Sequence, residues 1–66
     1  MNQAADVAAR VAEHLRIARL LEDHGDAIGA ILAYREVIRD GIEPAAHDAR
    51  LRVAALARTA LPASTR

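Results

Sequence analysis

Apolar residues recur every three or four positions along three segments of the chain, residues 4–23, 27–40 and 45–61. This spacing places the apolar side chains on one face of an α-helix. Sustained alternation of polar and apolar residues and Asn-Gly turns are absent, so no β-strand is expected. The pattern predicts an all-α, three-helix fold in which short connections make successive helices antiparallel neighbours. The positions expected to face inward are Val7, Val11, His14, Leu15, Ile17, Ala18 and Leu21 in the first segment, Ile28, Ile31, Tyr34, Val37 and Ile38 in the second, and Ala46, Ala49, Val53, Leu56 and Ala60 in the third.

Glycine, aspartate and proline mark the ends of these helices. Gly25 and Gly41 each follow an apolar segment, where a residue in the left-handed conformation commonly ends a helix. Asp26 is placed to cap the second helix by accepting hydrogen bonds from its first free amides. Pro44 is expected in the first turn of the third helix, where its missing N–H costs nothing.

The length of 66 residues predicts one small domain, residues 1–62. Pro62 is expected to end the third helix, and residues 63–66 to form a disordered tail. A domain of this size removes only about 60% of its unfolded surface from water. The chain also has no Cys, Trp or Phe and a single Tyr, so neither disulfides nor large aromatic residues enlarge the core. We therefore expect a second copy or a permanent partner to supply the missing burial.

The charge balance narrows the classes of function. The formal net charge is zero, which removes the usual signature of proteins that bind nucleic acid or anionic membranes. No apolar run approaches the roughly 18 residues of a membrane span, and no secretory signal precedes the first helix. We expect a cytoplasmic protein. The basic residues are all Arg, which together with the alanine content suggests a bacterial or phage gene.

Small, apolar and aromatic residues flank the Gly25-Asp26 turn in a fixed order. They are Ile17, Ala18 and Leu21 before the turn and Ala30, Ile31 and Tyr34 after it. Over residues 11–41 this order resembles the tetratricopeptide repeat, a helix-turn-helix unit, and the third helix resembles the first helix of a following repeat through Val53 and Ala54. One and a half repeats exclude a solenoid. The departures from the family pattern are His14 in place of an aromatic residue, Val37 in place of alanine, and the late Pro44.

The resemblance implies where a partner would bind. In this family ligands lie along the surface formed by the first helices of the repeats. The positions on that surface would be Leu15, Arg19, Glu22, Leu51 and Arg58. The Lys/Asn clamp that some members use for a C-terminal carboxylate is missing, because the chain has no Lys and its one Asn is Asn2. The resemblance therefore implies a peptide or helix of a partner protein as ligand, rather than a chaperone tail.

A second and weaker resemblance involves residues 39–44 and the alanine- and leucine-containing helix after them. This segment is similar to one in the small helical co-chaperones of type III secretion needles. The length of the chain fits that family, whereas the helix break at Gly25 does not. The resemblance implies a small subunit that folds fully only on its partner.

Titratable residues provide little basis for catalysis or metal binding. Glu22, Asp23, His24 and Asp26 are close in sequence, but their spacing fits no known metal loop, so we interpret them as a solvated turn. His14 lies on the apolar face and is interpreted as a semi-buried histidine, hydrogen-bonded across a helix or dimer interface. No nucleophile has a base at suitable spacing, and no glycine-rich phosphate loop occurs. We expect no enzyme activity, metal or cofactor.

Arginines could in principle form a nucleic-acid-binding face on the second and third helices. Arg50 and Arg52 diverge by about 200° around a helix, however, and acidic residues are interleaved with the basic ones. A small DNA-binding regulator is therefore only the third hypothesis. The arginines concerned are Arg35, Arg39, Arg50, Arg52 and Arg58.

Apolar residues in excess of one core suggest self-association. The first helix begins well before the repeat-like unit, and the third carries a second apolar stripe formed by Leu51, Ala54, Ala55 and Leu61. Because two apolar stripes require two neighbours, a homodimer is expected. The self-association contacts would be Val7, Val11, Leu51 and Leu61. The sequence thus favours a non-enzymatic protein-interaction module, with an obligate small subunit, co-chaperone or anti-activator as the alternative.

Overall fold

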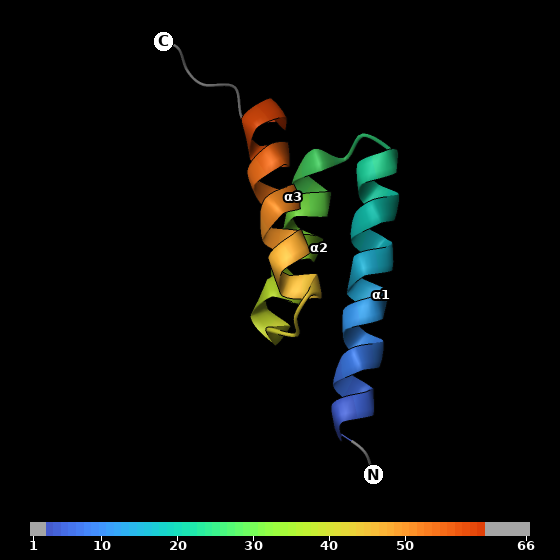
Figure 1. The fold of residues 1–66 in the computed structure, drawn as a ribbon. Coiled ribbons are helices and arrows are strands. Elements are labelled where there is room, and N and C mark those ends of the chain that lie inside the picture. The colour runs from blue at the N-terminus through green and yellow to red at the C-terminus, as the bar shows by residue number, and fades with distance from the viewer. Residues whose placement is uncertain (1–2, 61–66) are drawn as a thin grey trace.

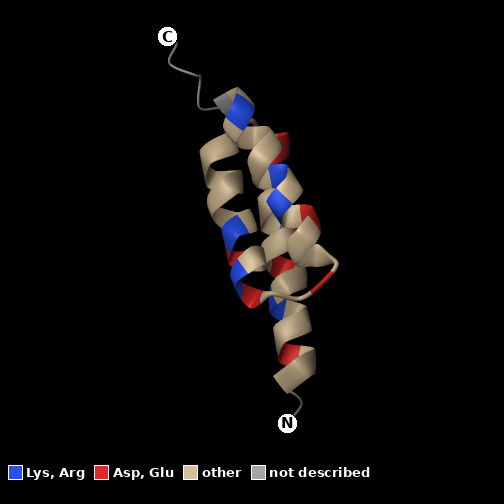
Figure 2. Cartoon of the chain, turned by 60° about the vertical axis from the view of Figure 1, so that its left-hand side comes forward, with Lys and Arg blue, Asp and Glu red and all other residues tan. Residues whose placement is uncertain are grey.

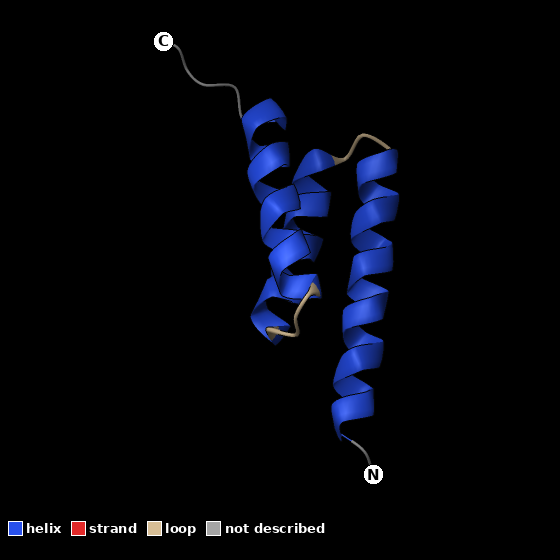
Figure 3. Ribbon diagram, viewed as in Figure 1, coloured by secondary structure: helices blue, strands red, loops and turns tan. Residues whose placement is uncertain are grey.

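The computed structural model describes residues 3–60, with the backbone alone for residue 60, and these residues form three α-helices. Helix α1 spans Gln3–Asp23, α2 spans Ala27–Asp40 and α3 spans Ala45–Ala60 (Figure 1). The described residues contain no strand (Figure 3). The prediction of an all-α chain is therefore confirmed, and each helix begins within one residue of its expected start.

Helix α2 is the central element of the fold. It packs against both α1 and α3, and short turns make each successive pair antiparallel (Figure 1). Helix α1 is the longest, and its N-terminal turns extend beyond the end of α2. Helices α1 and α3 form the two borders of a groove that includes Tyr34 of α2.

The turn between α1 and α2 forms as its residues predict. Gly25 adopts a φ of 82° and Gly41, after α2, a φ of 71°, which is the left-handed region that glycine enters without steric cost. The Asp26 carboxylate accepts a hydrogen bond from the backbone N–H of Gly29 at 2.9 Å. A side chain at position 29 would collide with that carboxylate. The Asp26 cap in this geometry therefore leaves room only for glycine at position 29.

The start of α3 differs from the expectation. Pro44 precedes the helix instead of lying in its first turn, because the helical backbone begins at Ala45 while the Pro44 carbonyl already accepts from the N–H of Asp48 at 3.0 Å. The Glu43 carboxylate accepts from the N–H of His47 at 3.1 Å. The cap of α3 is thus a glutamate placed before the proline.

Small residues dominate the core. Ala18 of α1, Ala30 of α2 and Ala49 of α3 are fully buried, which allows the three backbones to approach closely. Tyr34 is 3% exposed and fills the space between the helices. The buried apolar residues are Val11, Ala18, Ala30, Tyr34, Val37, Ala46, Ala49 and Leu56, and most other expected positions are half-buried around them.

The prediction that Ile28 faces the core is wrong. Ile28 is 51% exposed. The face that α2 buries is defined by Ala30, Tyr34 and Val37, and position 28 lies about 160° around the helix from Ala30. Ile28 therefore points away from α1 and α3.

Candidate functional site

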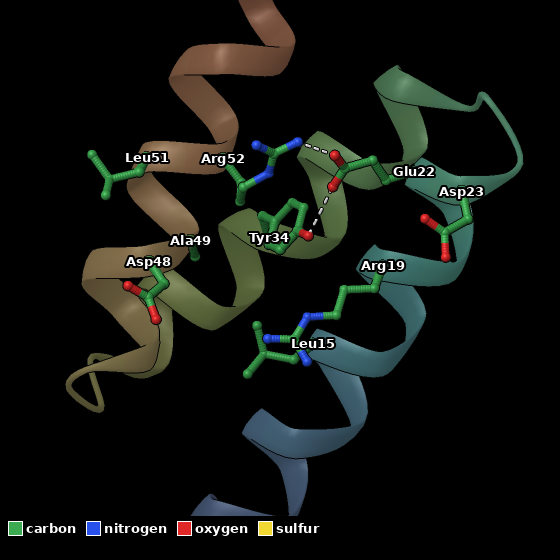
Figure 4. A pocket seen from close by; sticks show the side chains of 9 residues that line it. All are labelled: Leu15, Arg19, Glu22, Asp23, Tyr34, Asp48, Ala49, Leu51 and Arg52. Atoms are coloured by element: carbon green, nitrogen blue, oxygen red, sulfur yellow. Dashed lines mark hydrogen bonds and ion pairs between the residues drawn. The ribbon is translucent and has the colours of Figure 1, made fainter.

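A groove of about 490 Å³ opens between α1 and α3 (Figure 4). It is named here the α1–α3 groove. Helices α1 and α3 form its two sides, and Tyr34 of α2 lies between them. Its lining consists of Leu15, Arg19, Glu22 and Asp23 from α1, Tyr34 from α2, and Asp48, Ala49, Leu51 and Arg52 from α3.

Glu22, one of the residues that line the groove, connects all three helices. One carboxylate oxygen accepts a hydrogen bond from the Tyr34 hydroxyl at 3.0 Å, and the other accepts from the guanidinium of Arg52. The Glu22 side chain is 23% exposed and that of Arg52 46%, so the ion pair is only partly shielded from water. Both dashed contacts are visible in Figure 4. The network links α1 to α3, because each contributes one charged partner.

The three groups shift one another's proton affinity. The hydrogen bond from Arg52 holds the pKa of Glu22 below its ordinary value, against the opposing effect of burial, and the bond from Tyr34 acts in the same direction. Burial raises the pKa of the Tyr34 phenol, and its bond to the Glu22 carboxylate raises it further. At neutral pH the network therefore contains an ionised glutamate and a protonated tyrosine.

Four of the five positions assigned to partner binding line this groove. They are Leu15, Arg19, Glu22 and Leu51. Arg58 is exposed on α3 and does not line it. Glu22 is engaged with Tyr34 and Arg52, so its first role is to join the helices.

The sequence analysis did not assign the remaining lining residues, Asp23, Tyr34, Asp48, Ala49 and Arg52, to partner binding. Glu22 and Arg52 are thirty positions apart, and no local pattern relates residues at that distance. Asp48 could have been found, since it lies one turn before Leu51 on α3.

Charges without a partner remain inside the groove. Within residues 3–60, Arg19, Asp23 and Asp48 make no ion pair, whereas Arg52 does. Leu51 is 57% exposed at the α3 side, opposite the half-buried Leu15 of α1. Among residues 3–60, the groove thus combines apolar contact area with an arginine and two carboxylates that form no ion pair.

His14 lies outside the groove, between α1 and α2. Its Nδ1 is 3.7 Å from a carboxylate oxygen of Asp40, and both atoms are buried without a hydrogen bond in the described part of the chain. The distance is too long for a hydrogen bond. Arg10 also faces Asp40, at 3.9 Å. His14 is therefore half-buried as expected, but it faces a carboxylate across the helix pair without bonding to it.

Of the four expected self-association contacts, only Val11 needs correction, and the other three stay predictions. Val11 is 5% exposed and belongs to the core of its own chain, so it cannot contact a second copy. It was expected on an overhang, but α2 extends far enough to cover it. Val7 is half-buried and packs against the same core. Leu51 is exposed, and Leu61 lies outside the described residues.

Among residues 3–60, no group of three or more His, Cys, Asp or Glu side chains is arranged to hold a metal ion. Two of the three carboxylates around the first turn have other contacts: Glu22 joins the helices and Asp26 caps α2. His24 contacts the carbonyl of Leu20 at 2.8 Å. Within the same residues, α1, α2 and α3 are each too short or too polar to cross a lipid bilayer.

Basic and acidic residues alternate over the three helices in Figure 2. Five arginines of the described part form ion pairs with carboxylates, which lowers the positive potential available to a polyanion. They are Arg10, Arg16, Arg39, Arg50 and Arg52.

Comparison of the chain with protein-family models, curated protein sequences and solved structures gives no match.

Proposed function

We propose that this chain is a non-enzymatic protein-interaction module whose α1–α3 groove holds a peptide or helix of a partner protein. The observation that carries the proposal is the convergence of Leu15 and Arg19 from α1 with Leu51 from α3 on one groove. The sequence pattern independently predicts the same three residues for partner binding. A groove with apolar area and unpaired charges can bury an apolar side chain while pairing charged groups beside it.

The proposal includes a tetratricopeptide-like hairpin formed by α1 and α2. Its support is the full burial of Ala18 and Ala30, one small residue in each helix, with the buried Tyr34 beyond them. Small residues at a crossing allow close packing, which is the physical reason for that family's pattern. In the family, ligands lie along the first helices, and here α1 and α3 border the groove.

The free charges of the groove define the ligand's chemistry. A carboxylate on the ligand would pair with Arg19, and a basic side chain would pair with Asp23 or Asp48, since none of the three has an ion-pair partner in the described part of the chain. Between these groups Leu15 and Leu51 offer apolar contact. The ligand class is therefore an amphipathic peptide with one apolar anchor and charges of both signs.

A crosslinking experiment tests this proposal. A photoreactive amino acid replaces Arg19 in one variant and Arg35 in the control; both arginines are exposed and lack an ion pair in the described part, but only Arg19 lines the groove. We expect irradiation in the cells that produce the protein to link position 19, and not position 35, to one discrete protein. Equal labelling at both positions, or none at 19, contradicts the groove as a binding site.

A second candidate, an obligate small subunit that folds fully only on its partner, is favoured by apolar residues outside the groove. Leu20, Ile28 and Leu32 are 48%, 51% and 57% exposed. A chain that needs a partner should melt without cooperativity when isolated. A sharp thermal transition of the purified protein would contradict the obligate-subunit function and be consistent with the interaction module.

A further inference from the structure

We propose that α3 is a self-pairing helix, and that a second copy of the chain docks antiparallel along the residues Asp48, Leu51, Ala55 and Arg58, named here the α3 stripe. The inference deepens the proposed function and rests on it, because it identifies one partner of the interaction module as the chain itself. Asp48 and Leu51 also line the α1–α3 groove, so the stripe forms its outer border.

The spacing of the α3 stripe is that of a helix-packing seam. Its residues follow one another at intervals of three, four and three positions, which keeps them within an arc of about 80° on an α-helix. The opposite face of α3 carries the buried Ala49 and Leu56 that pack on α2. The stripe is therefore a second face of α3, and no other part of residues 3–60 covers Leu51, which is 57% exposed.

The α3 stripe is complementary to its own reversed copy. Asp48 and Arg58 lie five positions on either side of position 53, and Leu51 and Ala55 lie two positions on either side. In an antiparallel pair whose two-fold axis passes at the level of position 53, each Asp48 meets Arg58 of the second copy. Each Leu51 then meets Ala55 of the second copy, a large side chain against a small one. Two ion pairs and two apolar contacts form without any like-charge contact.

Charge availability supports this pairing. Asp48 and Arg58 are exposed, and neither forms an ion pair within residues 3–60, whereas five other arginines do. The helix dipole is the competing explanation, since Asp48 lies in the first turn of α3 and Arg58 in its last. The dipole acts within each chain, so its effect cannot depend on the sequence of a second chain. That difference allows a decisive experiment.

The test is charge complementation measured as solution mass. Light scattering after size exclusion, over a concentration series, should give twice the 7.1 kDa chain mass for the wild type. Asp48→Arg and Arg58→Asp should each give the monomer mass at the same concentrations, because like charges then meet twice. Their equimolar mixture should regain the doubled mass, since each variant supplies the charge that the other has lost. The control variants Asp6→Arg and Arg35→Asp, reversed outside the stripe, should keep the wild-type mass.

Three outcomes overturn the pairing: a monomeric wild type, single variants that keep the doubled mass, or a mixture that stays monomeric. Circular dichroism of each variant checks that its helices are intact. A second measurement covers variants that lose their fold. The chain has no cysteine, so Leu51→Cys mixed with Ala55→Cys should form a disulfide-linked dimer faster than either alone, and equal rates would contradict the antiparallel register.

The outcomes also separate this inference from the proposed function. A monomeric wild type that still crosslinks to a foreign protein through position 19 retains the interaction groove and removes the self-pairing. A dimer that responds as described, with no labelling at position 19, retains the self-pairing and removes the groove as a site for other partners.

Discussion

Tyr34 on α2 donates its phenolic hydrogen to the carboxylate of Glu22 on α1 across 3.0 Å, although twelve positions separate the two residues. The ring is buried while its hydroxyl reaches the groove. The one aromatic side chain of the protein therefore serves both the core and the wall of the candidate site.

Replacement of Tyr34 by Phe tests the value of this bond. The ring remains buried and Glu22 keeps Arg52, so we expect the loss of one hydrogen bond, about 0.5–1.5 kcal/mol. For a domain of this size each 1 kcal/mol lowers the Tm by roughly 4–8 °C. Thermal unfolding followed by circular dichroism measures the change. The same substitution in a Glu22→Gln background should cost less, and an equal cost would show that the bond to the carboxylate contributes nothing.

Stability should depend on pH through the same pair. The pKa of Glu22 is lowered in the folded state. Its contribution to the free energy of unfolding is therefore complete above the unfolded-state pKa of about 4.3, and it is lost as the pH falls through the folded-state pKa. The pKa of Tyr34 is raised in the folded state. Its contribution to the free energy of unfolding is therefore complete below the unfolded-state pKa of about 10, and it is lost as the pH rises through the folded-state pKa. Urea unfolding between pH 3 and 11 measures the free energy of unfolding on both the acid limb and the alkaline limb of this pH dependence. A Glu22→Gln variant should flatten the acid limb, and an unchanged limb would assign it to other carboxylates.

Gly29 and Asp26 should show strong coupling. In the wild type, Gly29→Ala displaces the Asp26 carboxylate, and the loss of this cap destabilises the protein by about 0.5–2 kcal/mol. The higher helix propensity of alanine stabilises it by roughly 1 kcal/mol. We expect a net change near zero or slightly destabilising. In an Asp26→Ala background no cap remains to be lost, so Gly29→Ala should stabilise by about 0.5–1 kcal/mol. Chemical denaturation of the four variants measures the coupling, and simple additivity would contradict it.

The small residue at the crossing of α1 and α2 should resist enlargement. Ala18 is fully buried, so Ala18→Leu forces the helices apart at a cost of about 1–3 kcal/mol or more. Ala12 is exposed on the same helix, and Ala12→Leu should change stability by no more than about 0.5 kcal/mol. Urea unfolding of the two variants provides the comparison. Equal effects would mean that the close packing at position 18 contributes no stability.

Sequence reasoning located much of the groove because two kinds of regularity coincide there. Leu15, Arg19 and Glu22 share a helix face by their three- and four-residue spacing, and Leu51 belongs to the second stripe of α3. The sequence could not reveal that Glu22 binds Arg52, because the partner of a carboxylate among several arginines is undefined until the helix orientations are known. It also assigned Val11 to an interface, since the pattern shows which face is apolar and not which neighbour covers it.

The positions at which the helices begin and end follow from local features of the sequence. Gly25 and Gly41 adopt positive φ, and Asp26 caps α2, because those properties depend on backbone sterics and hydrogen bonds within a few residues. By contrast, the packing of the helices sets which charges meet and which apolar residues stay exposed. The contacts of Glu22 with Arg52, and the exposure of Ile28, depend on the distance and rotation of one helix relative to another. Those quantities arise from packing of the whole chain, and no local pattern contains them.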